Sequence, residues 1–409
     1  MKLWQTNPFH QLTMTSGEGS TIRDRAGNSY LDLLSGTWCN VMGYSHPRWV
    51  HAVQEQAEKL AHVGPPFFTQ EIEVALMRLK EILPPQLNRA VFLNTGSEAV
   101  ELSLKLARAY TGAEKIISFD QGYYGATSHA LAISEAGRTS SYLPYHGNTD
   151  RLPVPDCNNC PKGVSWPCEK RIPCLDQLAV SQGEDSEKIA AIIYEPVHAG
   201  AGNIAPPIGY GKRLRELTDQ CNGVLIAEEV TTGMGRTGKW FGFQHEDMVP
   251  DILVIGKAIG GGLPVAVVVT TEEIERKCKD ILVRHVQSHQ NDPFSGRIAA
   301  EVISIMQDEN MIERAGVMGD YFMTRLNELK SSCPGIKAVR GRGLMIGIQL
   351  QPELAKHGGE VAEKLLEQGF ITNYHVPSNS FRLFPPFIIT VQEIDSFIDT
   401  FHTLLPAGQ

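Results

Sequence analysis

Short apolar runs alternate with helical patterns along the middle of the chain, and this alternation limits the possible folds more than any other feature. The runs are rich in valine and isoleucine and fall between residues 90 and 270. Such runs, separated by amphipathic helices, predict β-α-β units and a mostly parallel, buried sheet. We therefore predict an α/β fold with a helix at Ser97–Tyr110. The expected strands are Ala90–Leu93, Lys115–Phe119, Ile189–Tyr194, Gly223–Glu229, Ile252–Ile255 and Val265–Val269.

The two ends of the chain have a different pattern from the middle. Gly19–Leu34 predicts a hairpin that turns at residues 26–28. From about Pro293 we expect a long helix, and after it short strands in the last third of the chain. These strands are Leu344–Leu350, Phe370–Asn373 and Phe381–Leu383.

The domain organisation follows from these patterns. A chain of 409 residues with 42% hydrophobic and 20% charged residues can build a large domain and a smaller companion. We expect residues 49–293 to form the large domain, with a cysteine-containing insertion at residues 151–176. Residues 1–48 and 294–409 should together form a smaller α+β domain.

Charge and hydropathy exclude some classes of partner. The net charge of −9 argues against a basic surface for nucleic acid. No stretch is long and apolar enough to span a bilayer, and residues 1–12 lack the pattern of a secretory signal. We expect a cytoplasmic protein that binds neither membrane nor nucleic acid.

Four of the eight cysteines cluster in the insertion. A reducing compartment favours metal binding over disulfides for such a cluster, and its C-x2-C start suits zinc. The second pair has the looser C-x5-C spacing, so thiols without a metal are the favoured interpretation and a structural zinc is the alternative. The residues concerned are Cys157, Cys160, Cys168 and Cys174.

Gly96 and Ser97 stand between a predicted strand and a predicted helix. Free backbone N–H groups and a hydroxyl at a helix N-terminus suit an anion such as phosphate. Ser97 would also serve as an ordinary helix cap without any ligand.

Tyr123 lies in a loop just past a predicted strand, between Gly122 and Gly125. The carboxyl ends of strands in α/β folds are where ligands bind, and an aromatic ring there can stack on a flat cofactor. Packing of the ring in the core is the alternative.

Glu228 and Glu229 end a strand that we expect to be buried, where a carboxylate is costly without a partner. Alternation along the strand places Glu228 and Val230 on one face and Glu229 on the other. One glutamate is therefore free to face a cationic ligand atom while the other makes structural hydrogen bonds.

Lys257 follows a predicted strand and precedes a run of glycines. A lysine at the mouth of a strand suits a Schiff-base nucleophile, although a lysine extending from the strand end into solvent is the simpler explanation of this motif alone. The nearby G-x-G-x-x-G run at Gly233–Gly238 follows a strand, but residues 239–251 have no helical period. A dinucleotide site would need a helix there, so we reject it.

Taken together and in this order, the motifs resemble the class III, fold-type I aminotransferases that depend on pyridoxal 5′-phosphate. The resemblance covers nearly the whole chain, from Tyr30–Asp32 and Gly43–Pro47 to Phe381–Pro386. Its most specific parts are Glu228–Gly238 and Gly256–Pro264. It implies a large domain with a mostly parallel sheet of the seven-stranded type, and a smaller α+β domain.

The resemblance implies a role for each of four residues around the cofactor ring. Lys257 would hold the cofactor and later move a proton. Glu228, where the family usually has aspartate, would pair with the pyridine nitrogen. Val230 and Tyr123 would cover the two ring faces.

The resemblance also implies a shared phosphate site. Gly96 and Ser97 would bind the phosphate from within the same subunit. Ser288 matches a family threonine that binds phosphate from the neighbouring subunit, which implies a homodimer. Ser288 and Asp292 depart from the commoner threonine and asparagine, and the Asp-Pro form resembles the dialkylglycine decarboxylase branch.

For substrate binding, Arg382 matches an arginine that grips a carboxylate, a task that suits the guanidinium fork. Glu195 matches a glutamate that in some relatives pairs with this arginine when the substrate presents an amine. Side chains that we expect to shape the pocket are Thr37, Trp38, Tyr124 and Arg138. Tyr124 and Thr231 stand where histidine and glutamine are usual.

The leading functional hypothesis is an aminotransferase that uses an amino acid or amine and an oxo acid. Decarboxylation, racemisation and elimination use the same residues, so a pyridoxal-phosphate decarboxylase, racemase or lyase is an alternative. A non-catalytic binding protein on this scaffold is another.

Overall fold

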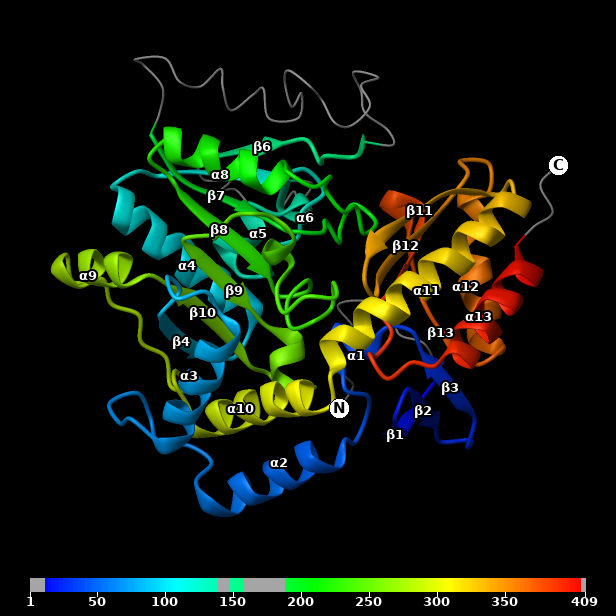
Figure 1. Cartoon of the computed structure of the whole chain (residues 1–409), viewed down its shortest axis with the longest axis horizontal. Helices are drawn as coiled ribbons and strands as arrows, with labels where there is room; N and C mark the ends of the chain where they lie inside the picture. The colour runs from blue at the N-terminus through cyan, green and yellow to red at the C-terminus, as the bar shows by residue number, and fades with distance from the viewer. Residues whose placement is uncertain (1–11, 139–147, 158–187, 406–409) are drawn as a thin grey trace, which may run out of the picture.

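The structure is a computed structural model of the chain, and it describes residues 12–138, 148–157 and 188–405. Its largest sheet has seven strands in the order β4-β10-β9-β8-β7-β5-β6 (Figure 1). The strands are β4 Arg89–Leu93, β10 Ala266–Thr270, β9 Ile252–Ile255, β8 Val224–Glu229, β7 Ile189–Tyr194, β5 Lys115–Phe119 and β6 Thr149–Leu152.

The sheet is mostly parallel, as the sequence predicts, and three of its strands have the predicted bounds. From β6 through β5, β7 and β8 to β9 each neighbouring pair is parallel, whereas β10 is antiparallel to both β9 and β4. Parallel neighbours need a long crossover between them. The short link from β9 to β10 therefore forces an antiparallel return, and this link carries Lys257.

Both faces of the sheet are covered, which follows from the apolar side chains that alternate along each strand. In β9, Ile252 and Val254 join the hydrophobic cluster that includes α4, whereas Leu253 and Ile255 join the cluster that includes α10. The helices concerned are α2 Pro47–Lys59, α3 Gln70–Ile82, α4 Gly96–Thr111, α8 Tyr210–Gln220, α9 Glu272–Asp280 and α10 Pro293–Asp308. Shorter helices are α1 Ser35–Trp38, α5 Ser128–Ala132 and α6 Glu135–Arg138.

The two ends of the chain meet in a smaller α+β unit (Figure 1). One sheet has the order β1-β2-β3-β13, and in it Phe370 of β13 pairs with Leu31 of β3. A second sheet has the order β11-β12-β15-β14. The strands are β1 Met14–Glu18, β2 Thr21–Asp24, β3 Ser29–Asp32, β11 Ile336–Arg342, β12 Met345–Leu350, β13 Phe370–Ile371, β14 Asn373–His375 and β15 Ser380–Leu383. The helices are α11 Met311–Ser332, α12 Gly358–Glu367 and α13 Val391–Leu404.

The structure confirms the predicted hairpin, in which β2 and β3 pair around a turn where Gly27 has a φ of 89°. The prediction of a single strand at Phe370–Asn373 is wrong. The chain leaves β13 after Ile371 and enters β14 at Asn373, so the segment contributes to two different sheets. The domain boundaries at residues 48 and 293 stay predictions.

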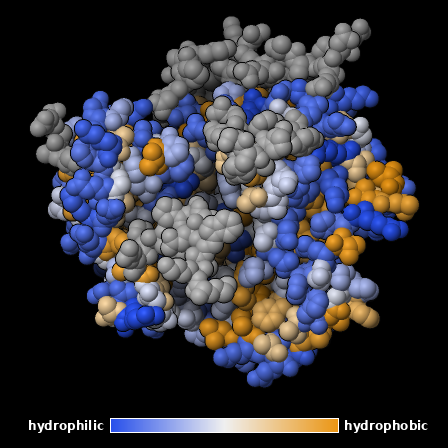
Figure 2. Space-filling model, turned by 180° about the vertical axis from the view of Figure 1, so that it is seen from behind, coloured by the Kyte–Doolittle hydropathy of each residue, from blue (hydrophilic) through white to orange (hydrophobic). Residues whose placement is uncertain are grey.

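The surface is mixed in character. Figure 2 shows a largely hydrophilic face with hydrophobic side chains gathered at its lower and right-hand parts. In the part of the chain that the structure describes, no helix is long and apolar enough to cross a membrane.

Candidate active site

The structure brings Lys257 and Glu228 to the same cavity. The cavity has a volume of about 370 Å³ and lies where β8 and β9 end and α4 begins. This edge of an α/β sheet is the usual ligand site. Other predicted residues that line the cavity are Gly96, Ser97, Tyr123, Tyr124 and Val230.

Lys257 is held in an unusual position for a lysine. Its φ of 48° lies in the left-handed region, which costs free energy for a residue with a side chain. Nζ donates a hydrogen bond of 2.6 Å to Oγ1 of Thr231 and lies 4.3 Å from the centroid of the Trp38 ring. Burial lowers the pKa of Lys257, so its amine gives up a proton more readily than a solvated lysine does.

Glu228 is buried beside the cavity, and no basic side chain in the described residues forms an ion pair with it. Burial, and after it the charge of Glu195, raises the pKa of Glu228 to about 8, and Lys257 opposes the shift. A buried carboxylate that lines a cavity without an ion-pair partner suits a ligand that supplies a cationic N–H group.

Glu229 points to the other face of β8, as the alternation predicts. Its Oε1 accepts the N–H of Phe243 at 2.8 Å, and its Oε2 accepts the N–H of Gly242 at 2.6 Å and the hydroxyl of Thr232 at 2.8 Å. These bonds tie β8 to the segment that follows it, so Glu229 has a structural role.

The first turn of α4 faces the cavity and is shaped for close contact. The alternative that Ser97 caps this helix is wrong, because Thr95 is the N-cap and forms a capping box with Glu98. The Ser97 hydroxyl instead accepts the N–H of Ala126 at 3.0 Å. A Cβ at Gly125 would lie 2.7 Å from the Ser97 Oγ, so only glycine fits there. The helix N-terminus and the glycine loop form a cradle for an anion.

Val230 and Tyr123 border the cavity with different degrees of burial. Val230 is buried and packs tightly, since a Cβ at Gly96 or at Gly256 would lie 2.9 Å from its methyl groups. Tyr123 is about half exposed, with a relative exposure of 51%. Tyr124, which we expected to shape the pocket, is almost fully buried, and its hydroxyl accepts the N–H of Phe119 at 3.2 Å.

Arg382 projects from β15 toward Trp38, with its guanidinium carbon 5.5 Å from the ring centroid. Its Nε and Nη2 donate to Oδ1 of Asn373 at 3.1 and 2.8 Å, and its Nη1 donates to the carbonyl of Ala199 at 3.3 Å. Burial lowers the pKa of Arg382 to about 10, which keeps it cationic at neutral pH. In the described residues Arg382 forms no ion pair with Glu195.

The remaining predicted residues lie apart from the cavity. Thr37 and Ser288 are exposed and do not line it. Cys157 is exposed, whereas the other three clustered cysteines lie outside the described residues, as does the side chain of Arg138. The three cysteines are Cys160, Cys168 and Cys174.

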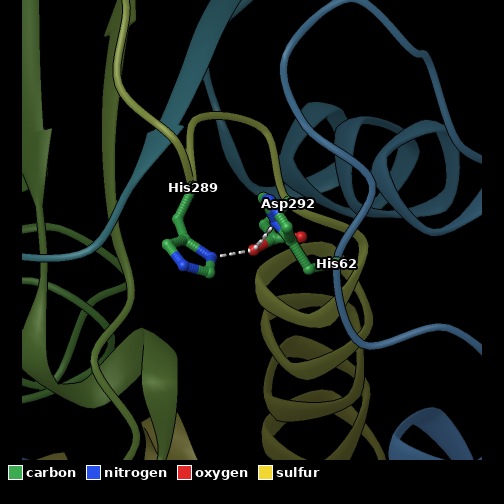
Figure 3. Close-up of side chains that lie close together, drawn as sticks. All are labelled: His62, His289 and Asp292. Carbon is green, nitrogen blue, oxygen red and sulfur yellow. Dashed lines mark hydrogen bonds and ion pairs between the residues drawn. The ribbon is translucent and has the colours of Figure 1, made fainter.

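His62, His289 and Asp292 converge near the start of α10 (Figure 3). Nδ1 of His62 and Nδ1 of His289 lie 3.0 and 2.5 Å from the same Oδ2 of Asp292. Ligand atoms around a tetrahedral zinc ion stand about 3.3 Å apart, and a helix N-terminus favours an anion over a cation. Hydrogen bonds therefore account for this trio, which ties residues 60–69 to residues 288–292.

The family model for class III aminotransferases matches residues 4–405, which is nearly the whole chain. The chain belongs to the class III aminotransferases. The acetylornithine aminotransferase of Methanothermobacter thermautotrophicus is 33% identical over 97% of this chain and 94% of that protein. A leucine/methionine racemase of Thermococcus litoralis is 31% identical over 96% of this chain and 90% of that protein. An (S)-enantioselective omega-transaminase from Thermomicrobium roseum superposes with a TM-score of 0.90 at 26% identity, covering 98% and 96% of the two chains.

Class III aminotransferases depend on pyridoxal 5′-phosphate, so this chain is a pyridoxal-phosphate-dependent enzyme with a fold-type I structure. The cavity fits that cofactor. It offers a buried carboxylate with which none of the described residues forms an ion pair, a lysine of lowered pKa, and an anion cradle at the first turn of α4. The family and the fold agree with the predictions from the sequence.

Some residues around Lys257 and Arg382 were not among the candidate site residues from the sequence. Cys39 lines the cavity, and Thr231 bonds Lys257 directly. Thr231 follows Val230 at the end of β8, and this adjacency was a usable signal. Ala199 bonds Arg382 across 183 residues and Asn373 bonds it across nine, and the sequence carries no local signal for either contact.

Proposed function

We propose that this aminotransferase moves an amino group between an amino acid or amine and an oxo acid, with Lys257 and Glu228 acting on opposite ends of one cofactor ring. The observation that carries the proposal is that both side chains line one cavity beside the first turn of α4. When bound, pyridoxal phosphate supplies an electron-withdrawing ring that weakens bonds at the substrate carbon.

Each residue has a role that its surroundings support. Burial lowers the pKa of Lys257, which favours the uncharged amine needed to bond a carbonyl carbon and to accept a proton. Glu228 holds the proton of the ring nitrogen. Gly96 and Ser97 bind the phosphate, Val230 and Tyr123 cover the ring faces, and Arg382 binds a substrate carboxylate.

The test is product analysis of purified holoenzyme with a panel of amines and amino acids, with and without 2-oxoglutarate. We expect an amino acid product only when both an amine and an oxo acid are present. Because one relative is named as a racemase, chiral analysis of leucine and methionine without an oxo acid belongs in the panel. Turnover of a single amine to carbon dioxide, to the other enantiomer or to an elimination product would overturn transamination.

We also propose that two copies of the chain form a homodimer with shared active sites. Ser288 is exposed and lies outside the cavity of its own chain. The exposed hydrophobic side chains Phe67, Phe68, Leu282 and Val286 lie within or shortly before the two segments, residues 60–69 and 288–292, that the His62–Asp292–His289 contact ties together. These features support a surface that a second copy covers.

Mixed dimers test the sharing directly. A Lys257→Ala chain and a Ser288→Ala chain are each defective, but a hybrid of the two contains one cavity with both Lys257 and the partner's Ser288 intact. We expect activity to return on mixing and reassembly. No recovery of activity, or a monomer by light scattering, would contradict the proposal.

We also propose a cytoplasmic location. The buried thiols of Cys278 and Cys333 support it, because a reducing compartment keeps cysteines in the thiol form.

A further inference from the structure

The turn that carries Ser288 is fastened to the large sheet. The N–H of Gln290 donates to the carbonyl of Gln287 at 3.3 Å, which closes the turn and leaves Ser288 exposed within it. Just after the turn, the N–H of Asn291 donates to the carbonyl of Phe92 on β4 at 3.0 Å, and its Oδ1 accepts the Phe92 N–H at 2.9 Å. These bonds fix the place where the turn leaves the sheet.

A second restraint on the turn comes from Asp292, which is almost fully buried. A carboxylate oxygen can only accept, so His62 and His289 both donate from Nδ1 to the same Oδ2, at 3.0 and 2.5 Å. The two imidazole rings also contact each other, with centroids 4.3 Å apart (Figure 3). One oxygen of Asp292 therefore joins the residue that follows Ser288 to a segment outside the turn.

We propose that Asp292 is a positioning residue for the cofactor of the neighbouring subunit. By holding His62 and His289 on one oxygen, it fixes the turn so that Ser288 meets the phosphate in the partner's cavity. The inference rests on the proposed homodimer with shared active sites and adds the residues that aim the shared contact. Serine needs this support because it lacks the β-branch that restricts rotation of a threonine side chain, so the backbone of the turn must place its hydroxyl.

The exposure of the side chains gives the direction in which the turn points. Along residues 283–288 exposed and partly buried side chains alternate, and Arg284, Val286 and Ser288 are the exposed ones. Ser288 thus lies on the outward side of this segment together with Val286. Asp292 and the two histidines do not line the cavity of their own chain. The effect of the trio is therefore expected in the partner's cavity.

Titration of the apoenzyme with cofactor tests the inference without relying on turnover. Asp292→Leu removes the acceptor that joins the two histidines, and we expect the dissociation constant of pyridoxal phosphate to rise about tenfold. Pyridoxal, which lacks the phosphate, should bind this variant and the wild type equally well. Asp292→Asn keeps an oxygen for the two histidines and should lose no more than about threefold. Glu309→Leu, just after the other end of α10, is the matched control, because Glu309 also accepts from a histidine, His46, at 3.0 Å.

The variant Ser288→Ala separates this inference from the proposed homodimer. It should weaken the binding of pyridoxal phosphate about as much as Asp292→Leu, and the double variant should lose little more, because both changes remove the same contact. If Ser288→Ala weakens binding and Asp292→Leu does not, or if Asp292→Leu weakens pyridoxal equally, the positioning role is wrong and the shared site stands. If Ser288→Ala binds like wild type, the shared site is wrong and the inference fails with it.

A mixed dimer shows in which subunit Asp292 acts. A hybrid of a Lys257→Ala chain and an Asp292→Leu chain, isolated with two different affinity tags, has one cavity with Lys257. This cavity receives the partner's Ser288 from a chain whose Asp292 is intact. We expect wild-type affinity for pyridoxal phosphate there, followed by the absorbance of the lysine-bound cofactor. A hybrid as weak as the Asp292→Leu homodimer would overturn the proposal, since Asp292 would then act on its own chain's cavity through Asn291 and β4.

Discussion

Glu228 should destabilise the enzyme when the cofactor is removed, and the substitution Glu228→Gln tests this directly. Burial raises the pKa of Glu228 from 4.5 to about 8 in the folded chain. When the pKa of a carboxyl group is higher in the folded than in the unfolded state, the group contributes most to stability at a pH below its pKa in the unfolded state. This contribution is lost as the pH rises toward its pKa in the folded state. The pH window is therefore about 4.5 to 8.

The size of the effect follows from the shift. One pKa unit corresponds to about 1.4 kcal/mol, so the full shift is worth about 5 kcal/mol at high pH. In the wild type the Lys257 cation offsets part of the cost of the buried Glu228 charge. In Glu228→Gln the Lys257 cation loses this counter-charge, which reduces the gain in stability. We therefore expect apo Glu228→Gln to be more stable than apo wild type by about 2–4 kcal/mol at pH 8.5, and nearly equal to it at pH 5.

The assay is urea unfolding of cofactor-free protein between pH 5 and 8.5, followed by circular dichroism. Glu229→Gln is the comparison variant: burial also raises the pKa of Glu229, to about 7, but its carboxyl group accepts three hydrogen bonds that an amide cannot all accept. We expect this variant to be less stable at pH 5 by about 1–3 kcal/mol. If the unfolding free energy of Glu228→Gln follows that of wild type across the whole pH range, Glu228 is not a buried carboxylate awaiting a cation.

Two smaller changes probe the surroundings of the cofactor. Thr231→Val removes the hydroxyl that accepts a hydrogen bond from Lys257 Nζ. We expect its kcat to fall about tenfold in steady-state assays while the cofactor stays bound. Thr231→Ser keeps the hydroxyl and should retain most of the activity. Gly96→Ala places a Cβ 2.9 Å from a methyl group of Val230, so the affinity for pyridoxal phosphate, titrated on apoenzyme by absorbance, should fall at least about tenfold. Unchanged values in either case would show that these contacts do not organise the site.

The large sheet was predictable because its strands are buried on both faces and therefore nearly all apolar. β5, β7 and β9 are found at the predicted residues, and β7 and β9 are made almost wholly of apolar side chains. β6 was missed because its sequence, Thr149–Leu152, contains polar residues and pairs only at the edge of the sheet. Edge strands lack the continuous apolar run on which the prediction depends.

The cavity was predictable as far as it depends on strand ends and adjacent glycines, as for Glu228 and Lys257. The contacts of Arg382 were not predictable. They depend on the register of β14 against β15 and on a peptide group 183 residues away. The pairing of Glu195 with Arg382, expected when the substrate presents an amine, stays a prediction.

The most direct test of the whole account is to reduce the holoenzyme with borohydride and map the labelled peptide by mass spectrometry. Reduction fixes the bond between cofactor and lysine, and the account predicts one phosphopyridoxyl group per chain, on Lys257, with no label in Lys257→Ala. A modified lysine elsewhere in the sequence, or a chain that never takes up the cofactor, would contradict the claim that Lys257 and Glu228 hold the same ring.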